Sequence, residues 1–194
     1  EWENQIYEDL AWLGLTWAPE IWRQSDRLPR YRIALQNLWD QGLLYPCTCS
    51  RADIRAAVAA PQEGAPLHGP DGLIYPGTCR PATPLSGPMP NHPLRLDMAR
   101  ARTLISEPLT YTETGLENPG CVHVTDIEIT VGDVALARPG MGASYHLAIV
   151  CDDADQAITH VVRGADLGPA TAIHVLLQRL FDLPTPIYHH HRLI

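Results

Sequence analysis

The 194-residue sequence predicts an α/β fold, because strand and helix patterns alternate in its C-terminal part. Two apolar runs, YHLAIV (145–150) and AITHVV (157–162), have the length and composition of buried strands. Apolar residues at helical spacing follow over 169–181, and PIYHHHRLI (186–194) has the pattern of a further strand. This order predicts a βαβ unit, in which ligands bind at the carboxyl ends of parallel strands.

Two helices are expected ahead of this unit. Apolar residues recur every three or four positions within 5–15 and again within 29–41, which is the spacing of one helix face. Gly14 is expected to help end the first helix, and Ser25 and Asp26 are candidates for capping the second.

The middle of the chain is expected to be loop followed by short strands. Residues 59–93 hold nine of the eighteen prolines, so this stretch is predicted to be mostly loop. A hairpin turn is expected at 131–133, between the last two of the predicted strands. These strands are 94–98, 109–114, 122–130 and 134–138.

Composition excludes several classes of protein. No run approaches ~18 apolar residues and no leader peptide is visible, so a cytoplasmic protein without a membrane span is expected. The net charge of −8 argues against a non-specific nucleic-acid coat protein. All fourteen basic residues are arginines, so no lysine within this sequence serves as a catalyst or phosphate ligand. Of the five cysteines, Cys121 and Cys151 lie in predicted strands and are expected to pack there.

Two cysteines separated by one residue predict a metal site. Cys47 and Cys49 are poorly placed for a disulfide with each other but suit a soft cation such as Zn²⁺, which takes about four ligands. The segment YPCTC is echoed by YPGTC, which makes Cys79 the expected third ligand. Small buried residues are the alternative interpretation. Histidine would be the commoner choice for the fourth ligand, and three residues of the loop are candidates: Tyr75, His68 and Asp71.

Arg163 is a candidate anion-binding residue. It ends a predicted strand shortly before a helix begins, and its guanidinium offers two parallel N–H donors to a carboxylate. A salt bridge to Asp152, Asp153 or Asp166 is the alternative. Tyr145, at the start of the preceding predicted strand, is expected to bring a hydroxyl to the same pocket, or else to be a core aromatic.

Three consecutive histidines, His189 to His191, lie within the last predicted strand. Neighbouring residues of a strand point to opposite faces, so the three side chains are not expected to bind one metal ion together. One of them is expected to face a ligand.

Several motifs together resemble the glutamyl-tRNA synthetase family of class I enzymes, and the resemblance covers nearly the whole chain. The motifs are DLAWLGLTW (9–17), QSDRLPRY (24–31), GLLYPCTCSR (42–51), YHLAIVCDDADQAITHVVRGADL (145–167) and TAIHVLLQRL (171–180). The resemblance implies a Rossmann-like catalytic domain with an inserted zinc-containing connective subdomain. Residues 1–45 and 141–194 would form the two parts of the catalytic domain, and 46–140 the zinc-bearing, β-rich insertion.

The resemblance also implies roles for individual residues. Structural zinc would be bound by Cys47, Cys49, Tyr75 and Cys79, with Tyr75 as the fourth ligand. Tyr145 and Arg163 would contact glutamate. No catalytic side-chain nucleophile is implied.

The activity implied by the resemblance has two steps. Glutamate and ATP, with Mg²⁺, form glutamyl-adenylate and pyrophosphate, and the activated carboxyl is then transferred to tRNA. YHLA and RGADL are typical of a shortened branch of the family that modifies queuosine in tRNA(Asp). The alternatives are charging of tRNA(Glu) and, in another class, a zinc-ribbon binding module without catalysis. A monomer is expected.

Two segments that bind ATP in this family are expected outside the chain. Its histidine–glycine signature would precede Glu1, and its lysine-bearing loop would follow Ile194. The chain is therefore expected to be a fragment that does not form adenylate alone. Five arginines form either a surface facing tRNA or an ordinary solvated face: Arg27, Arg30, Arg32, Arg51 and Arg55.

Overall fold

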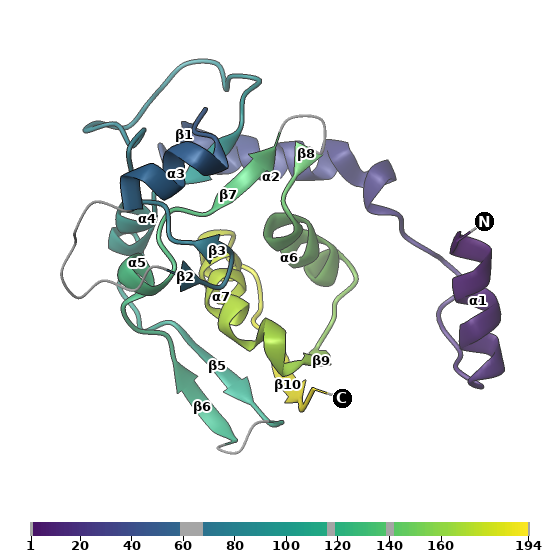
Figure 1. Cartoon of the computed structure of the whole chain (residues 1–194). Coiled ribbons are helices and arrows are strands. Elements are labelled where there is room, and N and C mark those ends of the chain that lie inside the picture. Colours follow the sequence, from purple (N-terminus) through teal and green to yellow (C-terminus); the bar gives the residue numbers. More distant parts are fainter. Residues whose placement is uncertain (1, 59–67, 116–118, 139–141, 194) are drawn as a thin grey trace.

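The computed structural model describes residues 2–58, 68–115, 119–138 and 142–193 (Figure 1). Its helices are α1 (Trp2–Trp12), η1 (Gln24–Arg27), α2 (Leu28–Asp40), α3 (Arg51–Val58), α4 (Met98–Thr103), α5 (Ile127–Thr130), α6 (Tyr145–Asp155), η2 (Ala165–Ala170) and α7 (Thr171–Leu180). Its strands are β1 (Leu44–Pro46), β2 (His68–Gly69), β3 (Gly72–Leu73), β4 (Leu94–Leu96), β5 (Thr110–Glu113), β6 (Gly120–His123), β7 (Ala135–Arg138), β8 (Gly142–Ala143), β9 (His160–Gly164) and β10 (Ile187–His191).

The predicted βαβ unit is confirmed. Strand β9 leads through η2 and α7 to β10, and the two strands pair in parallel with Arg163 opposite His190. Strand β10 also pairs in parallel with β5, and β6 completes the sheet in the order β6-β5-β10-β9. Strand β9 is therefore an edge strand, and Val162 is 67% exposed, so the prediction of a buried strand there is wrong.

A second, antiparallel sheet has the order β1-β4-β7-β8. Leu96 in β4 and Leu136 in β7 are fully buried, and the same core includes Leu38 of α2, Leu147 of α6 and Leu176 of α7. One apolar cluster thus joins α2, α6 and α7 to this sheet and, through Tyr188 of β10, to the first sheet. A fully buried side chain of this size contributes about 1.5–3 kcal/mol to folding. The expected division at residues 45 and 140 stays a prediction.

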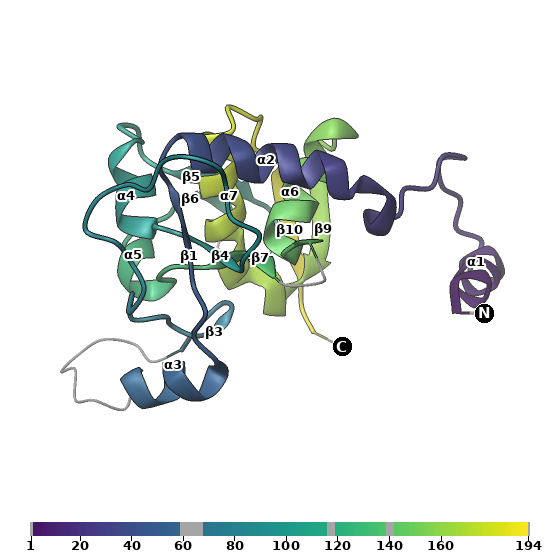
Figure 2. The ribbon, with the colours of Figure 1, turned by 90° about the horizontal axis from the view of Figure 1, so that it is seen from above.

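Helix α2 packs into the body, whereas α1 stands apart from it in both views (Figures 1 and 2). The predicted helix within 5–15 exists, but none of the residues of α1 is buried. Trp2 and Trp12 are each 84% exposed. The apolar face that the sequence predicts is therefore largely exposed among the described residues, with Ile6 at 55% and Leu13 at 60%.

The run 145–150 is a helix, which corrects the prediction of a strand. The Ser144 side chain caps α6 by accepting a hydrogen bond from the Leu147 backbone N–H. A run of six largely apolar residues suits a buried strand or a buried helix equally. Here the polar continuation through Asp155 extends the segment to eleven helical residues. Tyr145 and Cys151 accordingly lie on a helix, where Cys151 is buried as expected.

Other local predictions are also corrected. Strand β6 ends at His123, and α5 occupies the second half of the predicted strand 122–130. Val131 follows α5 directly, so the segment 131–133 joins a helix to β7 and is not a hairpin turn. Cys121 is exposed and does not pack in the core.

The start of α2 also differs from the prediction. Ser25 and Asp26 lie in η1, and no side chain caps α2, which has Pro29 in its first turn. Proline is favourable there because the first N–H groups of a helix have no intrahelical partner.

The proline-rich stretch is mostly loop, as predicted, for residues 68–93. Only the two-residue strands β2 and β3 form there, and 59–67 lie outside the described residues. Among the described helices, none has the length and apolar character needed to cross a membrane.

Candidate functional site

Three of the five cysteines converge at one end of the antiparallel sheet. Cys47 follows β1 directly, Cys49 lies two residues later, and Cys79 comes from the loop after β3. Their Sγ atoms all lie within 4.8 Å of one another, and the Sγ atoms of Cys49 and Cys79 are 3.4 Å apart. The turn at Gly77, whose φ is +80°, places Cys79 against the other two.

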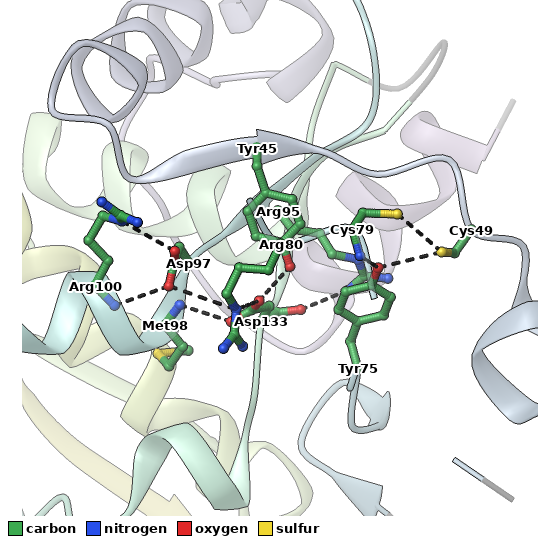
Figure 3. A network of polar contacts seen from close by, with 10 residues as sticks. All are labelled: Tyr45, Cys49, Tyr75, Cys79, Arg80, Arg95, Asp97, Met98, Arg100 and Asp133. Carbon is green, nitrogen blue, oxygen red and sulfur yellow. Dashed lines mark hydrogen bonds and ion pairs between the residues drawn. The ribbon is translucent and has the colours of Figure 1, made fainter. Parts of the chain in front are cut away.

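Tyr75 completes this group, which we call the sulfur cluster (Cys47, Cys49, Tyr75 and Cys79). Its hydroxyl oxygen lies 3.4 Å from the Cys49 Sγ and accepts a hydrogen bond of 2.8 Å from the Cys79 backbone N–H (Figure 3). Among the three candidates for a fourth ligand, Tyr75 reaches the sulfurs. His68 is exposed in β2, and Asp71 faces His146 and Arg138 instead.

The donor set of the sulfur cluster suits zinc. Zinc–sulfur bonds are about 2.3 Å long, so two thiolates of a tetrahedral site lie roughly 3.8 Å apart. Sulfur atoms within 4.8 Å therefore need only small movements to bind one ion. Burial raises the pKa of the Cys47 thiol, but hydrogen bonds with Tyr75 and Arg95 outweigh burial and lower that pKa to about 7.

A buried carboxylate, that of Asp133, lies beside the sulfur cluster (Figure 3). Asp133 accepts hydrogen bonds from the Tyr45 hydroxyl, from Arg80 Nε at 2.7 Å and from the Met98 backbone N–H at 2.9 Å (Figure 3). Arg95 donates to the Asp133 carbonyl oxygen at 2.7 Å, and its guanidinium lies 4.0 Å above the Tyr75 ring. Asp133 was not recognised from the sequence, where it lay in the expected hairpin turn.

The second site surrounds Arg163 at the carboxyl end of β9. Its three nitrogens all donate hydrogen bonds: Nε to His190 Nε2 at 3.1 Å, Nη1 to His174 Nδ1 at 3.1 Å, and Nη2 to Thr171 Oγ1 at 2.7 Å. We call this set the arginine cluster (Arg163, Thr171, His174 and His190). Its four side chains come from β9, α7 and β10, which are the elements of the βαβ unit.

The arginine cluster excludes the alternative interpretation of Arg163. Asp152 accepts hydrogen bonds from Arg27 and Tyr31. Within the described ranges, Arg163 makes no ion pair with Asp152, Asp153 or Asp166, and its hydrogen-bonded partners are uncharged oxygen and nitrogen acceptors.

Tyr145 lies beside the arginine cluster as the first residue of α6, where its side chain is 46% exposed. Its ring centroid is 5.9 Å from that of His174, which in turn accepts from Arg163. The structure therefore brings the two residues expected to contact glutamate to the same histidine.

The three consecutive histidines alternate in burial, as their position in a strand predicts. His189 and His191 are exposed, whereas His190 is fully buried. His190 Nδ1 lies 2.5 Å from Glu113 Oε2. Burial raises the pKa of Glu113, but hydrogen bonds from the His190 side chain and from the Gly115 and His190 backbone N–H groups lower it to about 2.

Comparison with known proteins identifies the family. Residues 1–68 and 119–194, more than half of the chain, match the model of the catalytic domain of class I tRNA synthetases (E and Q). The chain belongs to this family. The match includes Cys47, Cys49, Tyr145 and Arg163.

Three similar proteins of this synthetase family share one name. Glutamyl-Q tRNA(Asp) synthetase of Rhodobacter capsulatus is 55% identical over 203 residues, which cover 100% of this chain and 69% of that protein. The proteins of the same name from Albidiferax ferrireducens and Geobacter sulfurreducens are 40% and 38% identical, covering 99% and 96% of this chain. The chain spans 64% and 54% of the lengths of these two relatives.

Solved structures support the synthetase fold. A glutamate tRNA ligase from Elizabethkingia meningosepticum, crystallised in complex with its amino acid, superposes with a TM-score of 0.69 at 23% identity. The superposition covers 99% of this chain and 39% of that one. A glutamate-tRNA synthetase from Elizabethkingia anophelis gives the same TM-score. The α/β catalytic fold of this family is therefore established for the chain.

The arginines of this synthetase chain do not form one continuous surface. Arg27 and Arg30 form ion pairs with Asp155 of α6. Arg51 and Arg55 instead line a cleft of about 750 Å³ beside the sulfur cluster. The sequence did not distinguish these two settings, because residue type alone does not show which acidic groups lie near an arginine in the fold.

Proposed function

We propose that this chain carries the glutamate-binding and zinc-binding parts of an ATP-dependent synthetase that transfers glutamate to queuosine in tRNA(Asp). The observation that carries the proposal is the setting of Arg163. It is a cation at the carboxyl end of a parallel strand, and its hydrogen-bonded partners among the described residues are uncharged. A carboxylate is a group that such a guanidinium binds through two parallel N–H···O hydrogen bonds. The names of relatives that align with nearly the whole chain support the same substrate.

The proposed reaction begins with a carboxylate oxygen of glutamate attacking the α-phosphorus of ATP, with Mg²⁺, and pyrophosphate leaves. A hydroxyl of queuosine then attacks the glutamyl-adenylate carbonyl, and AMP leaves. Arg163 and Tyr145 would hold glutamate during both steps, and catalysis would depend on positioning and on stabilising phosphate charge. We further propose that the protein acts as a monomer in the cytoplasm, where its proposed tRNA substrate is found.

We also propose that Cys47, Cys49, Tyr75 and Cys79 bind a structural zinc ion in the insertion formed by 46–140. Three thiols and a phenol oxygen within bonding reach of one point support this ligand set. Zinc would fix a loop segment that has little apolar core of its own, since its separate buried cluster consists of Tyr45, Cys47 and Tyr75.

The test is glutamate binding by the full-length protein, measured by isothermal titration calorimetry. Arg163→Ala should weaken binding roughly 10- to 100-fold, because hydrogen bonds to a charged group are worth about 1.5–3 kcal/mol. Tyr145→Phe should weaken it less, about threefold to tenfold, since one neutral hydroxyl is lost. Arg179→Ala is the matched control, because Arg179 is an exposed arginine of α7 that pairs with Glu107. Unchanged binding by Arg163→Ala would contradict the proposal.

Acylation assays separate the tRNA substrates. The full-length protein should transfer labelled glutamate to tRNA(Asp) that contains queuosine and leave tRNA(Glu) uncharged. Charging of tRNA(Glu) instead would favour the alternative of a glutamyl-tRNA synthetase. The zinc-ribbon alternative requires no parallel βαβ unit, and this chain has one.

A further inference from the structure

Arg163 lies at the centre of a chain of polar side chains that crosses the molecule. This series of side chains joins the βαβ unit to α6 and to the turn between β2 and β3. In spatial order its members are Asp71, His146, His174, Arg163, His190 and Glu113. Both of its ends are carboxylates, and three histidines separate them from the guanidinium.

The first arm of this chain runs from Arg163 to Asp71. Arginine has no acceptor, so His174 Nδ1 must accept the hydrogen bond from Arg163 Nη1 and therefore carries no proton. The proton of neutral His174 is then on Nε2, which donates to His146 Nδ1 at 3.1 Å. The proton of His146 is in turn on Nε2, which lies 3.7 Å from Asp71 Oδ1.

The second arm runs from Arg163 to Glu113. His190 Nε2 must accept from Arg163 Nε, which leaves the proton of His190 on Nδ1. That N–H donates to Glu113 Oε2 at 2.5 Å. Thr171 Oγ1 accepts from Arg163 Nη2 at 2.7 Å and lies 3.3 Å from His190 Nε2, whose single lone pair already accepts from Arg163 Nε. The hydrogen bonds from Arg163 thus fix which ring nitrogen of His174 and of His190 carries the proton.

Burial makes this arrangement rigid. His190 and Thr171 are fully buried, and His174 and His146 are 2% and 7% exposed. Burial, reinforced by the positive charge of Arg163, lowers the pKa of His174 to about 2. His174 is therefore neutral at neutral pH and keeps the lone pair that Arg163 needs.

The arms leave part of the guanidinium available to a ligand. Three of its five N–H groups donate to Thr171, His174 and His190, and one N–H on each terminal nitrogen remains outside the contacts that the described residues make. Two such N–H groups match the two oxygens of a carboxylate. A carboxylate of the protein in direct contact with Arg163 would instead compete with that ligand.

We propose that Glu113–His190 and Asp71–His146–His174 are two polar relays that orient Arg163 as a receptor for a carboxylate of glutamate. The link between Asp71 and His146 is a 3.7 Å contact, and the other links are hydrogen bonds. His174 and His190 are positioning residues in this view, since they act through Arg163. Fixing the guanidinium before the ligand arrives lowers the entropic cost of binding. The inference rests on the proposed function for the identity of the ligand, but the arrangement of protons does not depend on it.

Nuclear magnetic resonance tests the relays without glutamate. Full-length protein labelled with ¹⁵N-histidine should show His174 and His146 protonated on Nε2 and His190 protonated on Nδ1 at pH 7, with assignments from single His→Gln variants. The opposite tautomer at His174 or His190, or a doubly protonated ring at either, would overturn the proposal.

Glutamate binding then tests whether the relays matter to the ligand. His174→Leu and His190→Leu remove the acceptors for Arg163 and should each weaken binding roughly tenfold or more, as expected for hydrogen bonds to a charged group. His174→Asn and His190→Gln keep an acceptor oxygen near the original nitrogen and should bind within about threefold of wild type. His191→Leu, on the exposed face of the same strand, is the matched control.

The variants separate this inference from the proposed function. If Arg163→Ala loses glutamate while His174→Leu and His190→Leu fold and keep it, the relays are wrong and the glutamate site stands. If Arg163→Ala keeps glutamate, the glutamate site and its orientation both fail. If the leucine variants do not fold, the two amide variants provide the test. A tenfold or greater loss of glutamate affinity in both His174→Asn and His190→Gln would overturn the proposal, because a retained acceptor should preserve binding.

Discussion

The sulfur cluster and the arginine cluster are both compact polar groups, but they differ in the charge of their members. In the sulfur cluster, groups that become anions contact one another directly, with Cys49 3.4 Å from both Cys79 and the Tyr75 oxygen. In the arginine cluster, three uncharged acceptors surround a single cation. The difference indicates the charge of the ligand that each one suits: a cation for the sulfurs and an anion for Arg163.

Arg80 and Arg163, one near each cluster, differ in whether a carboxylate contacts the guanidinium directly. Arg80, next to Cys79, donates directly to the buried Asp133 carboxylate at 2.7 Å. Histidines separate Arg163 from Glu113 and Asp71. A direct ion pair fixes an arginine as part of the framework, whereas an arginine held by neutral acceptors keeps its charge for a ligand. This comparison predicts that disruption of the first region affects stability most, and disruption of the second affects binding most.

The largest effect is expected from loss of the proposed metal. Cys49→Ser should abolish binding of one zinc ion per chain, measured by elemental analysis, and should markedly lower the melting temperature. Apparent binding energies of structural zinc are about 10–16 kcal/mol in small metal-dependent domains, so a large part of the local fold depends on the ion. The control is Cys121→Ser, which changes an exposed thiol of β6. If Cys49→Ser retained one equivalent of zinc, the sulfur cluster would not be the metal site.

Asp133→Asn should give the next largest loss of stability. The variant leaves Arg80 without its ion pair and replaces an acceptor shared by Tyr45 and Met98. Asp133 is fully buried but the Arg80 side chain is 35% exposed, so the loss should be about 1–3 kcal/mol, the cost of leaving buried polar groups without a partner, to be measured by urea denaturation. Asp26→Asn changes an exposed aspartate and should have almost no effect. A loss below about 1 kcal/mol would show that Asp133 does not anchor the region.

Acid should destabilise the arginine cluster. His174 has its pKa lowered to about 2 from an ordinary value near 6.5, so below pH 6.5 the unfolded chain binds a proton that the folded chain does not. Stability is therefore present above pH 6.5 and falls on acidification, by up to about 1.4 kcal/mol per pH unit for one proton. Glu113, with its pKa lowered to about 2, adds a similar loss below about pH 4.5.

The matched comparison for this pH dependence is wild type against His174→Asn, by urea denaturation at pH 7, 6 and 5. Burial raises the pKa of Asp153 to about 6, which opposes the effect of His174 between about pH 4 and 6. Asp153 is present in both proteins, so its contribution cancels in the difference. Wild type should lose more stability than the variant between pH 7 and 5. Equal losses would mean that His174 does not stay neutral.

The sequence identified the groups whose chemistry is distinctive and missed those whose role depends on packing. Two cysteines separated by one residue, and an arginine at a strand end, pointed to the sulfur cluster and to Arg163. His174 lies in an apolar helix segment, where a histidine resembles an ordinary core residue. Glu113 and Asp133 are acidic residues near short strands, and only the fold shows that their carboxylates are buried.

Secondary structure shows a similar limit. The helix spacing within 29–41 and the strands 157–162 and 186–194 were predicted because their patterns are long or followed by clear turns. The helix over residues 145–150 was not predicted, since a largely apolar run of six residues fits either a strand or a helix. Periodicity predicted α1 correctly but not its exposure, because an apolar face does not specify what covers it.

The smallest effect is expected at the far end of the first relay. Asp71 is about a third exposed, and its oxygen lies 3.7 Å from His146 Nε2, so this contact is weaker than the one between Glu113 and His190. Asp71→Asn should weaken glutamate binding less than threefold, in line with the 0–1 kcal/mol of an exposed ion pair. Glu113→Gln should weaken it several-fold more, because its 2.5 Å hydrogen bond is fully buried. Titration calorimetry on both variants measures the difference, and a larger loss in Asp71→Asn would mean that Arg163 depends mainly on the turn between β2 and β3.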